Sequence, residues 1–181
     1  MSLRIYGNRQ LKTLPGRETR PTSARVREAV FNIWHGTIEG CRWLDVCAGT
    51  GSMGAEALCR GATLVVGIEK SNRACAIIQQ NWQSLASAEQ EWKVVRGDVV
   101  KLLPKLSGQQ FDRIYFDPPY AIGLYQPVLE AIAQSQLLDP NGEIAVEHNP
   151  QDWTPPVIPS WEIYREKVYG NTALTFYGVV D

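Results

Sequence analysis

Residues 44–54 read LDVCAGTGSMG, a stretch that decides the fold because it sets three glycines between an apolar run and a helical pattern. Glycine lets backbone N–H groups approach a ligand closely at a helix N-terminus. The spacing of Gly49, Gly51 and Gly54 also satisfies the dinucleotide fingerprint G-x-G-x-x-G, and Glu69 follows the first glycine by about 20 residues. The stretch therefore predicts a nucleoside-binding turn and, by itself, leaves the choice of cofactor open.

Apolar runs and helical patterns alternate around this turn. Strands are predicted at 42–47, 64–68, 92–96, 113–116 and 143–147, and helices at about 52–60, 72–86, 99–106 and 124–135. The alternation is typical of an α/β fold with a mostly parallel, doubly wound sheet. Residues 161–168 and 173–180 read instead as two strands joined by a short turn, which predicts a C-terminal antiparallel hairpin.

The first 36 residues differ from the remainder of the chain. Apolar side chains recur at helical spacing from Val26 to Trp34, which predicts an amphipathic helix packed on the core. Residues 1–27 carry a net charge of +6 and the rest carries −7. We therefore predict an N-terminal arm and helix at 1–36 and a main domain at 37–181.

The charge asymmetry favours a basic arm that meets a polyanion, with a solvated tail as the alternative. Arg25 and Arg27 fall outside the apolar stripe of the helix and are expected to stay free to face a ligand. The candidate contacts to the polyanion are Arg9, Lys12, Arg20, Arg25 and Arg27.

Several classes of protein are disfavoured by composition. No run approaches the roughly 18 apolar residues of a membrane span, and no signal-peptide pattern opens the chain, so a soluble cytoplasmic protein is expected. The four cysteines and two histidines form no zinc pattern, so no metal is expected.

Three acidic residues lie in or just after the ends of the first three predicted strands of the main domain. Asp45 could attract the ammonium group of a cationic cofactor and would repel a pyrophosphate. Glu69 could accept hydrogen bonds from both ribose hydroxyls, and Asp98 from an adenine amino group, although a helix N-cap is an equal alternative for Asp98. Together with Gly49 and Gly51, these acids favour S-adenosylmethionine over a nicotinamide dinucleotide.

The tetrapeptide Asp117-Pro118-Pro119-Tyr120 follows the fourth predicted strand and is the most specific signal in the chain. An exocyclic amine on a base is a poor nucleophile, so two acceptors must hold its hydrogens. The Asp117 carboxylate and the Pro118 carbonyl could do this, because consecutive prolines lack the N–H donors of a regular ladder. Tyr120 offers a ring on which the base could stack. The alternative is a structural turn with a core tyrosine.

These residues resemble the bacterial 16S ribosomal RNA guanine-N2 methyltransferases of the RsmD type. The resemblance covers most of the chain, and its most distinctive parts are RPTSARVREAVFN at 20–32 and YGNTAL at 169–174. It implies a seven-stranded class I methyltransferase fold and a flipped or looped-out guanine as the target. It further implies catalysis by residues 117–120 and an assembling small ribosomal subunit as the partner.

Three other functions remain as alternatives. A DNA adenine or cytosine amino-methyltransferase would use the same tetrapeptide. A nicotinamide-dependent oxidoreductase would use the glycine turn, but would leave Asp45 and Asp117 without a task. A non-catalytic ribosome-assembly factor would merely retain the cofactor pocket.

Overall fold

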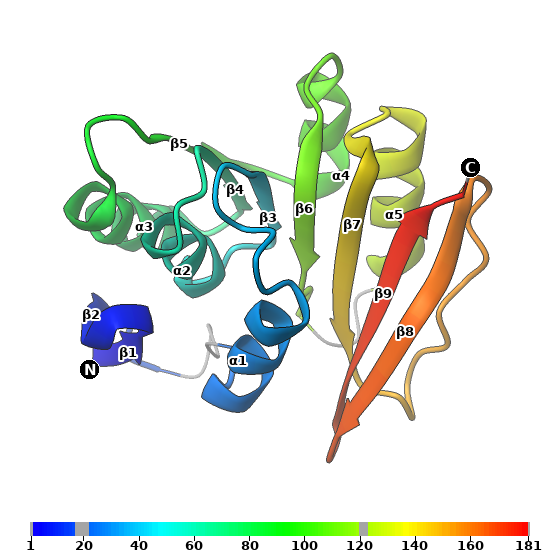
Figure 1. The fold of residues 1–181 in the computed structure, drawn as a ribbon, viewed down its shortest axis with the longest axis horizontal. Coiled ribbons are helices and arrows are strands. Elements are labelled where there is room, and N and C mark those ends of the chain that lie inside the picture. The colour runs from blue at the N-terminus through cyan, green and yellow to red at the C-terminus, as the bar shows by residue number, and fades with distance from the viewer. Residues whose placement is uncertain (1, 17–21, 120–122, 181) are drawn as a thin grey trace.

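The computed structural model describes residues 2–16, 22–119 and 123–180 of the chain. Its helices and strands follow the order of the sequence (Figure 1). The strands are β1 (Ser2–Ile5), β2 (Arg9–Lys12), β3 (Arg42–Val46), β4 (Leu64–Glu69), β5 (Glu91–Arg96), β6 (Phe111–Phe116), β7 (Leu138–His148), β8 (Trp161–Tyr169) and β9 (Thr172–Val179). The helices are α1 (Ala24–Ile33), α2 (Ser52–Cys59), α3 (Asn72–Leu85), α4 (Val99–Leu102) and α5 (Tyr125–Gln134), with short 3₁₀ turns η1 (Tyr6–Asn8) and η2 (Leu103–Leu106).

Seven strands form the central sheet in the order β5-β4-β3-β6-β7-β9-β8. The first five of these are parallel, and β9 runs antiparallel to both β7 and β8. The order reverses between β3 and β6, the point at which doubly wound sheets bind their ligands. The predicted class I methyltransferase fold, with its C-terminal hairpin, is confirmed.

Helices cover both faces of the sheet, so the core has two halves (Figure 1). On one face, α1, α2 and α3 pack around Trp34, Trp43 and Trp82. On the other face, α4, η2 and α5 pack around Phe111 and Phe116.

Two element boundaries differ from the prediction. The helix expected at 99–106 changes from α4 to the 3₁₀ turn η2, because Pro104 lacks the N–H that a continuous α-helix needs. Strand β7 starts at Leu138, five residues earlier than predicted, where Leu138 pairs with Phe111 before a register shift. Both differences lie at the end of the sheet away from the ligand-binding edge.

The N-terminal arm contains a β-hairpin that the sequence reading did not predict. Strands β1 and β2 pair across Gly7 and Asn8, which have φ values of 70° and 59°. A Gly-Asn pair between two alternating runs is a known hairpin signal, so Gly7 and Asn8 could have predicted this hairpin from the sequence. Leu11 of this hairpin is buried in the core beside α1 and α2, so the arm is attached to the main domain by packing.

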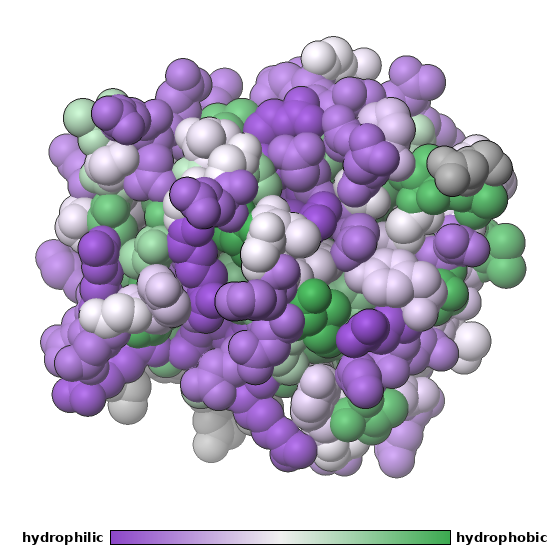
Figure 2. Space-filling view, in the orientation of Figure 1, coloured by the Kyte–Doolittle hydropathy of each residue, from purple (hydrophilic) through white to green (hydrophobic). Residues whose placement is uncertain are grey.

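The surface carries no large apolar area on the face shown in Figure 2, where hydrophobic atoms form small separated groups. Among the described residues, no helix is both long enough and apolar enough to cross a membrane. The most exposed large hydrophobic side chain of that part of the chain is Val157, in the loop that leads to β8.

Candidate functional site

A cavity of about 550 Å³ opens at the carboxyl edge of the sheet, around the reversal of strand order between β3 and β6. Its walls come from the glycine turn after β3, the ends of β4 to β7, the segment before α1 and the start of β9. The residues that line it include Thr22, Asp45, Gly49, Glu69, Asp98, Tyr115, Asp117, Pro118, Pro119 and Glu147. The volume falls within the roughly 300–1,000 Å³ of small-molecule sites.

The three acids predicted to hold a cofactor all line this cavity. Glu69 accepts hydrogen bonds from the backbone N–H of Gly49 at 2.7 Å and of Ser71 at 2.9 Å, so its carboxylate braces the glycine turn. Asp45 is buried and accepts from the Gly54 N–H at 3.2 Å. Asp98 caps α4 through the Lys101 N–H at 3.1 Å, so it is an N-cap that also faces the cavity.

The three glycines of the turn have different surroundings. Gly49 lines the cavity, and a Cβ at this position would meet no atom within 4 Å. A Cβ on Gly51 would come within 2.9 Å of Trp82 Nε1, and one on Gly54 within 2.4 Å of Trp82 Cζ2. The Trp82 indole N–H donates to the Gly51 carbonyl at 2.8 Å. Gly51, predicted to bind the cofactor, is therefore placed against Trp82, and Gly49 is the glycine on the cavity wall.

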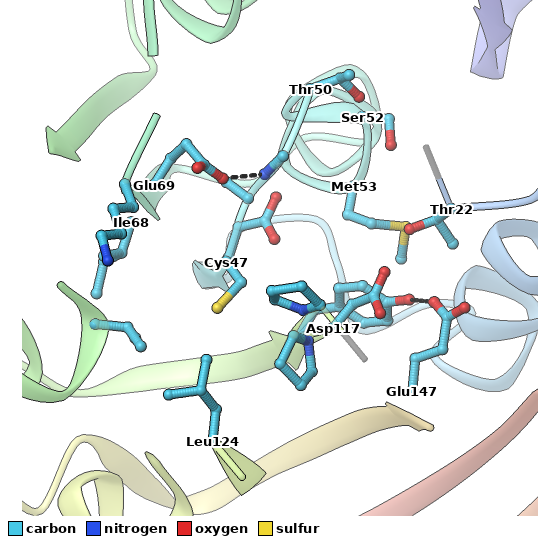
Figure 3. Close-up of a pocket in the computed structure, with 18 of the residues that line it drawn as sticks. Thr22, Cys47, Thr50, Ser52, Met53, Ile68, Glu69, Asp117, Leu124 and Glu147 are labelled. Carbon is cyan, nitrogen blue, oxygen red and sulfur yellow. Dashed lines mark hydrogen bonds between the residues drawn. The ribbon is translucent and has the colours of Figure 1, made fainter. Parts of the chain in front are cut away.

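Four side chains meet at the end of the cavity formed by β6 and β7. The Tyr115 hydroxyl donates to Glu147, and the Asp117 carboxyl interacts by hydrogen bonding with both Glu147 and the Thr22 hydroxyl. Figure 3 shows Thr22, Asp117 and Glu147 turned toward one another beside Met53. These residues come from three elements that lie far apart in sequence: the segment before α1, strand β6 with its end, and β7.

Burial and nearby carboxylates raise the pKa of two cavity carboxyl groups, Asp117 and Asp45. Burial and the neighbouring carboxylates of Glu147 and Asp45 raise the pKa of Asp117 well above its usual range, and the Thr22 hydroxyl acts in the opposite direction. Burial also raises the pKa of Asp45, against the stabilising Gly54 N–H. Of the ionisable Asp, Glu, Lys and Arg side chains that line the described cavity, five are acidic and one, Lys70, is basic. The site is therefore suited to a cationic ligand.

The three described residues of the predicted catalytic tetrapeptide lie at the same cavity. Asp117, Pro118 and Pro119 line the wall, with Pro118 buried and Pro119 exposed. Tyr120 lies outside the described residues, and so does Arg20 of the arm.

The remaining basic candidates do not line the cavity. Arg9 and Lys12 are exposed on the N-terminal hairpin, where the Lys12 ammonium donates to Gln80 at 3.1 Å. Arg25 is exposed on α1, with its guanidinium 5.3 Å from the Tyr169 ring centroid at the β8–β9 turn. All three remain accessible to a polyanion.

Arg27 differs from the expectation that it stays free. Its side chain is 4% exposed, and its Nε lies 2.6 Å from Glu56 on α2. Its Nη2 donates to the Arg4 carbonyl at 2.8 Å. The expectation is wrong because the buried face of α1 includes Arg27 together with apolar residues, and the guanidinium pairs there with the buried carboxylate of Glu56.

Three residues of the four-side-chain cluster, Thr22, Tyr115 and Glu147, were missed from the sequence, and Tyr115 was read only as part of a strand. Glu147 is the last residue of the fifth predicted strand, so the signal was an acid at the carboxyl edge that also holds Asp45 and Glu69. Thr22 was read only as the approach to a helix. Its contact with Asp117, 95 positions away, has no local signature.

Comparisons with known proteins agree with this architecture. A family model described as "Conserved hypothetical protein 95" matches residues 3–178. The chain is 33% identical to Ribosomal RNA small subunit methyltransferase D of Escherichia coli K12, covering 87% of this chain and 78% of that protein. The corresponding protein of Haemophilus influenzae is 29% identical, with 96% and 90% covered. A solved Escherichia coli protein, provisionally described as the methyltransferase yhhF, superimposes with a TM-score of 0.87 at 30% identity, covering 99% of this chain and 98% of its own.

Proposed function

Because the chain belongs to the family described as conserved hypothetical protein 95 and resembles two ribosomal RNA small subunit methyltransferases along most of its length, we propose that it methylates small-subunit ribosomal RNA. The methyl donor is S-adenosylmethionine, and the acceptor is the exocyclic N2 amine of a guanine. One observation carries this proposal: the acids at the carboxyl edge of the sheet line a single cavity with Asp117 and Pro118 at one end.

The cavity fits S-adenosylmethionine by its chemistry. The cofactor is cationic at its sulfonium and ammonium groups, and the described wall is predominantly acidic. Asp45 would face the ammonium group, Glu69 the ribose hydroxyls and Asp98 the adenine amine, with the open side of Gly49 against the cofactor. A dinucleotide pyrophosphate would be repelled by Asp45, which disfavours a nicotinamide cofactor. When bound, S-adenosylmethionine supplies an electrophilic methyl group with a neutral thioether as leaving group.

The side chains at the other end of the cavity handle the amine. Asp117 and the Pro118 carbonyl accept the two amine hydrogens, which orients the nitrogen lone pair toward the cofactor side of the cavity. The same oxygens stabilise positive charge that develops on the nitrogen. One proton leaves the nitrogen as its new bond to carbon forms, and Asp117 or water accepts it. Tyr120 would stack on the base.

The arm supplies the contact to the RNA backbone. We propose that residues 1–36 dock on RNA through Arg9, Lys12, Arg20 and Arg25, while residues 37–181 carry the chemistry. Arg27 is left out because it is buried in an ion pair. An assembling small subunit in the cytoplasm is the proposed substrate, because the named relatives act on small-subunit RNA.

The test is methyl transfer from radiolabelled S-adenosylmethionine to small ribosomal subunits from cells that lack the protein. Naked ribosomal RNA and duplex DNA serve as parallel substrates, and Asp117→Asn serves as the catalytic control. The labelled product is digested and compared with N2-methylguanosine. Binding of S-adenosylhomocysteine is measured by calorimetry for the wild type and for Asp117→Asn.

We expect label in N2-methylguanosine, and a loss of at least 100-fold in Asp117→Asn with cofactor binding retained. Label found only in DNA would show that the substrate is an adenine or cytosine amine of DNA and not ribosomal RNA. Cofactor binding without any transfer, together with an Asp117→Asn variant that restores every cellular phenotype, would point to a non-catalytic assembly factor.

A further inference from the structure

Glu147 is the acidic side chain of the cavity to which the proposed chemistry gives no task. It lies near the end of β7, is 6% exposed, and lines the cavity beside Asp117. Tyr115, on the neighbouring strand β6, donates its hydroxyl to one Glu147 oxygen. Figure 3 shows the Glu147 side chain reaching toward Asp117 and the cavity rather than away from them.

The surroundings of Glu147 favour a hydrogen-bond acceptor. A donor such as the Tyr115 hydroxyl stabilises the carboxylate form of its partner. Burial and then the carboxylates of Glu147 and Asp45 raise the pKa of Asp117 well above its usual range. When Asp117 ionises to receive an amine and releases its proton to solvent, the cavity wall offers the carboxylates of Glu147 and Asp117 beside Pro118.

Only one of the common nucleobases offers matching groups beside an exocyclic amine. In guanine, the N2 amine carries two hydrogens and the adjacent ring nitrogen N1 carries a third. In adenine and cytosine, the ring nitrogen next to the amine has a lone pair and no hydrogen. Such a lone pair opposite Glu147 would leave two acceptors facing each other in a buried site, which is costly.

We propose that Glu147 selects guanine by accepting the N1–H, while Asp117 and the Pro118 carbonyl accept the two hydrogens of the N2 amine. This inference rests on the proposed function and names the residue that discriminates between bases. Glu147 is a specificity-determining residue in this scheme, and Tyr115 positions its carboxylate. Binding of guanine displaces the proton that Asp117 carries in the free protein.

The experiment replaces the target guanosine in the RNA once the methylated nucleotide has been mapped. Synthetic ligation introduces guanosine, 2-aminopurine or 2,6-diaminopurine at that position. Both analogues keep the 2-amine and carry a lone pair at N1, but they differ at position 6. Both also lack the 6-carbonyl oxygen, so a shared defect reports on N1 or on that oxygen, and a relief of the defect in Glu147→Gln assigns it to N1. The values of kcat and KM are measured for the wild type, Glu147→Gln and Glu143→Gln.

Glu143→Gln is the matched control. Glu143 lies on the same strand and the same face as Glu147, and it likewise accepts a hydrogen bond from a tyrosine, Tyr164. It also accepts from the Trp34 indole at 2.6 Å, and it does not line the cavity. A loss of carboxylate charge on β7 is thus reproduced away from the site.

We expect the wild type to prefer guanosine over either analogue by at least 100-fold in kcat/KM, because sites built to bind a donor reject analogues that lack it. In Glu147→Gln the preference should fall below 10-fold, since the amide can donate to the N1 lone pair, with S-adenosylhomocysteine binding within about 3-fold of wild type. Glu143→Gln should keep the full preference.

Two results would overturn the assignment of Glu147 and leave the proposed function intact. One is a wild type that methylates guanosine and both analogues equally, an outcome that needs no variant to fold. The other is an unchanged preference in Glu147→Gln. A wild type that forms no N2-methylguanosine on the guanosine RNA would instead overturn the proposed function and this inference together.

Discussion

Asp117 is held by the fold in surroundings that oppose its own charge. Its pKa is raised chiefly by burial and then by the carboxylates of Glu147 and Asp45. A carboxyl group with a raised pKa in the folded state stabilises the protein below its unfolded pKa and loses that contribution as the pH rises through the folded value. The residue proposed as the hydrogen-bond acceptor for the amine is therefore a source of instability at neutral pH, as is common for functional sites.

The first prediction concerns that instability. Asp117→Asn should raise the free energy of unfolding by about 0.5–2 kcal/mol at pH 8, because a neutral amide has no charge to bury. The gain should shrink toward pH 4, where the wild-type carboxyl is already protonated. Denaturant unfolding at several pH values measures the difference. A variant less stable than wild type at pH 8 would show that the amide loses more in hydrogen bonding than it gains.

Thr22 allows a second prediction at the same scale. Its hydroxyl lowers the pKa of Asp117, whereas Glu147, Asp45 and burial raise it, and Tyr115 donates to Glu147 rather than to Asp117. Thr22→Ala should therefore move the acid limb of the pH–rate profile to higher pH. Thr22→Ser, which keeps the hydroxyl, should restore the wild-type limb. A limb that stays in place in Thr22→Ala would exclude the hydroxyl from control of Asp117.

Trp82 explains two glycines of the turn, Gly51, which was predicted to bind the cofactor, and Gly54, which completes the fingerprint spacing. Gly54→Ala should destabilise the protein by about 1–3 kcal/mol, because its Cβ would lie 2.4 Å from Trp82 Cζ2 and 2.9 Å from Val65 Cγ1. The double variant Gly54→Ala/Trp82→Leu should lose less stability than the two single variants lose together. Thermal unfolding of the wild type, both single variants and the double variant measures this difference. Strict additivity would contradict a direct contact.

The buried side chain of Arg27 links three elements of the fold. Arg27 on α1 pairs with Glu56 on α2, and Arg27 also donates to the Arg4 carbonyl in β1. One buried guanidinium thus connects the hairpin, the N-terminal helix and the helix that follows the glycine turn. Glu56 has a second partner in Arg60, at 3.1 Å.

Arg27→Met should cost about 3–5 kcal/mol in the free energy of unfolding, because it leaves a buried carboxylate with one basic neighbour and frees the Arg4 carbonyl. Arg27→Met combined with Glu56→Gln should recover part of that loss. The four proteins of this cycle are compared by denaturant unfolding. An Arg27→Met variant as stable as wild type would show that the two helices do not depend on the pair.

Elements with strong local signals were predictable, and long-range contacts were not. The strands of the main sheet and the C-terminal hairpin follow from apolar runs and turn residues, and the predicted boundaries hold to within about two residues except at β7 and η2. Asp45, Glu69 and Asp98 were found at strand ends, whereas Glu147 was missed although it ends a predicted strand. The roles of Gly51, Arg27 and Thr22 were not found, because each depends on a partner brought close only by the folded chain.

The whole molecule separates charge in space as well as in sequence. The cavity wall is acidic, whereas the exposed Arg9, Lys12 and Arg25 belong to the N-terminal arm and its helix. RNA affinity and cofactor affinity should accordingly respond differently to salt, since phosphate contacts release counterions and a small cofactor in a closed site does not.

Arg9→Glu/Lys12→Glu should weaken binding to small-subunit RNA by at least 10-fold at 50 mM salt and reduce the dependence of affinity on salt concentration. Cofactor binding should stay unchanged. Filter binding across a salt series and calorimetry with S-adenosylhomocysteine measure the two properties. Equal RNA affinity for variant and wild type would remove these two side chains from the docking surface.

The contact between Thr22 and Asp117 also bears on how such proteins can be recombined in evolution or in the laboratory. The segment that leads into α1 contributes a group to the reacting end of the cavity, so the arm is not an interchangeable attachment on a self-sufficient enzyme. A transplanted arm with the right charge but without a hydroxyl at this position would leave Asp117 with a higher pKa than in the original protein. New substrate ranges are therefore reached more readily by changing the hairpin of residues 2–12 than by exchanging the arm as a whole.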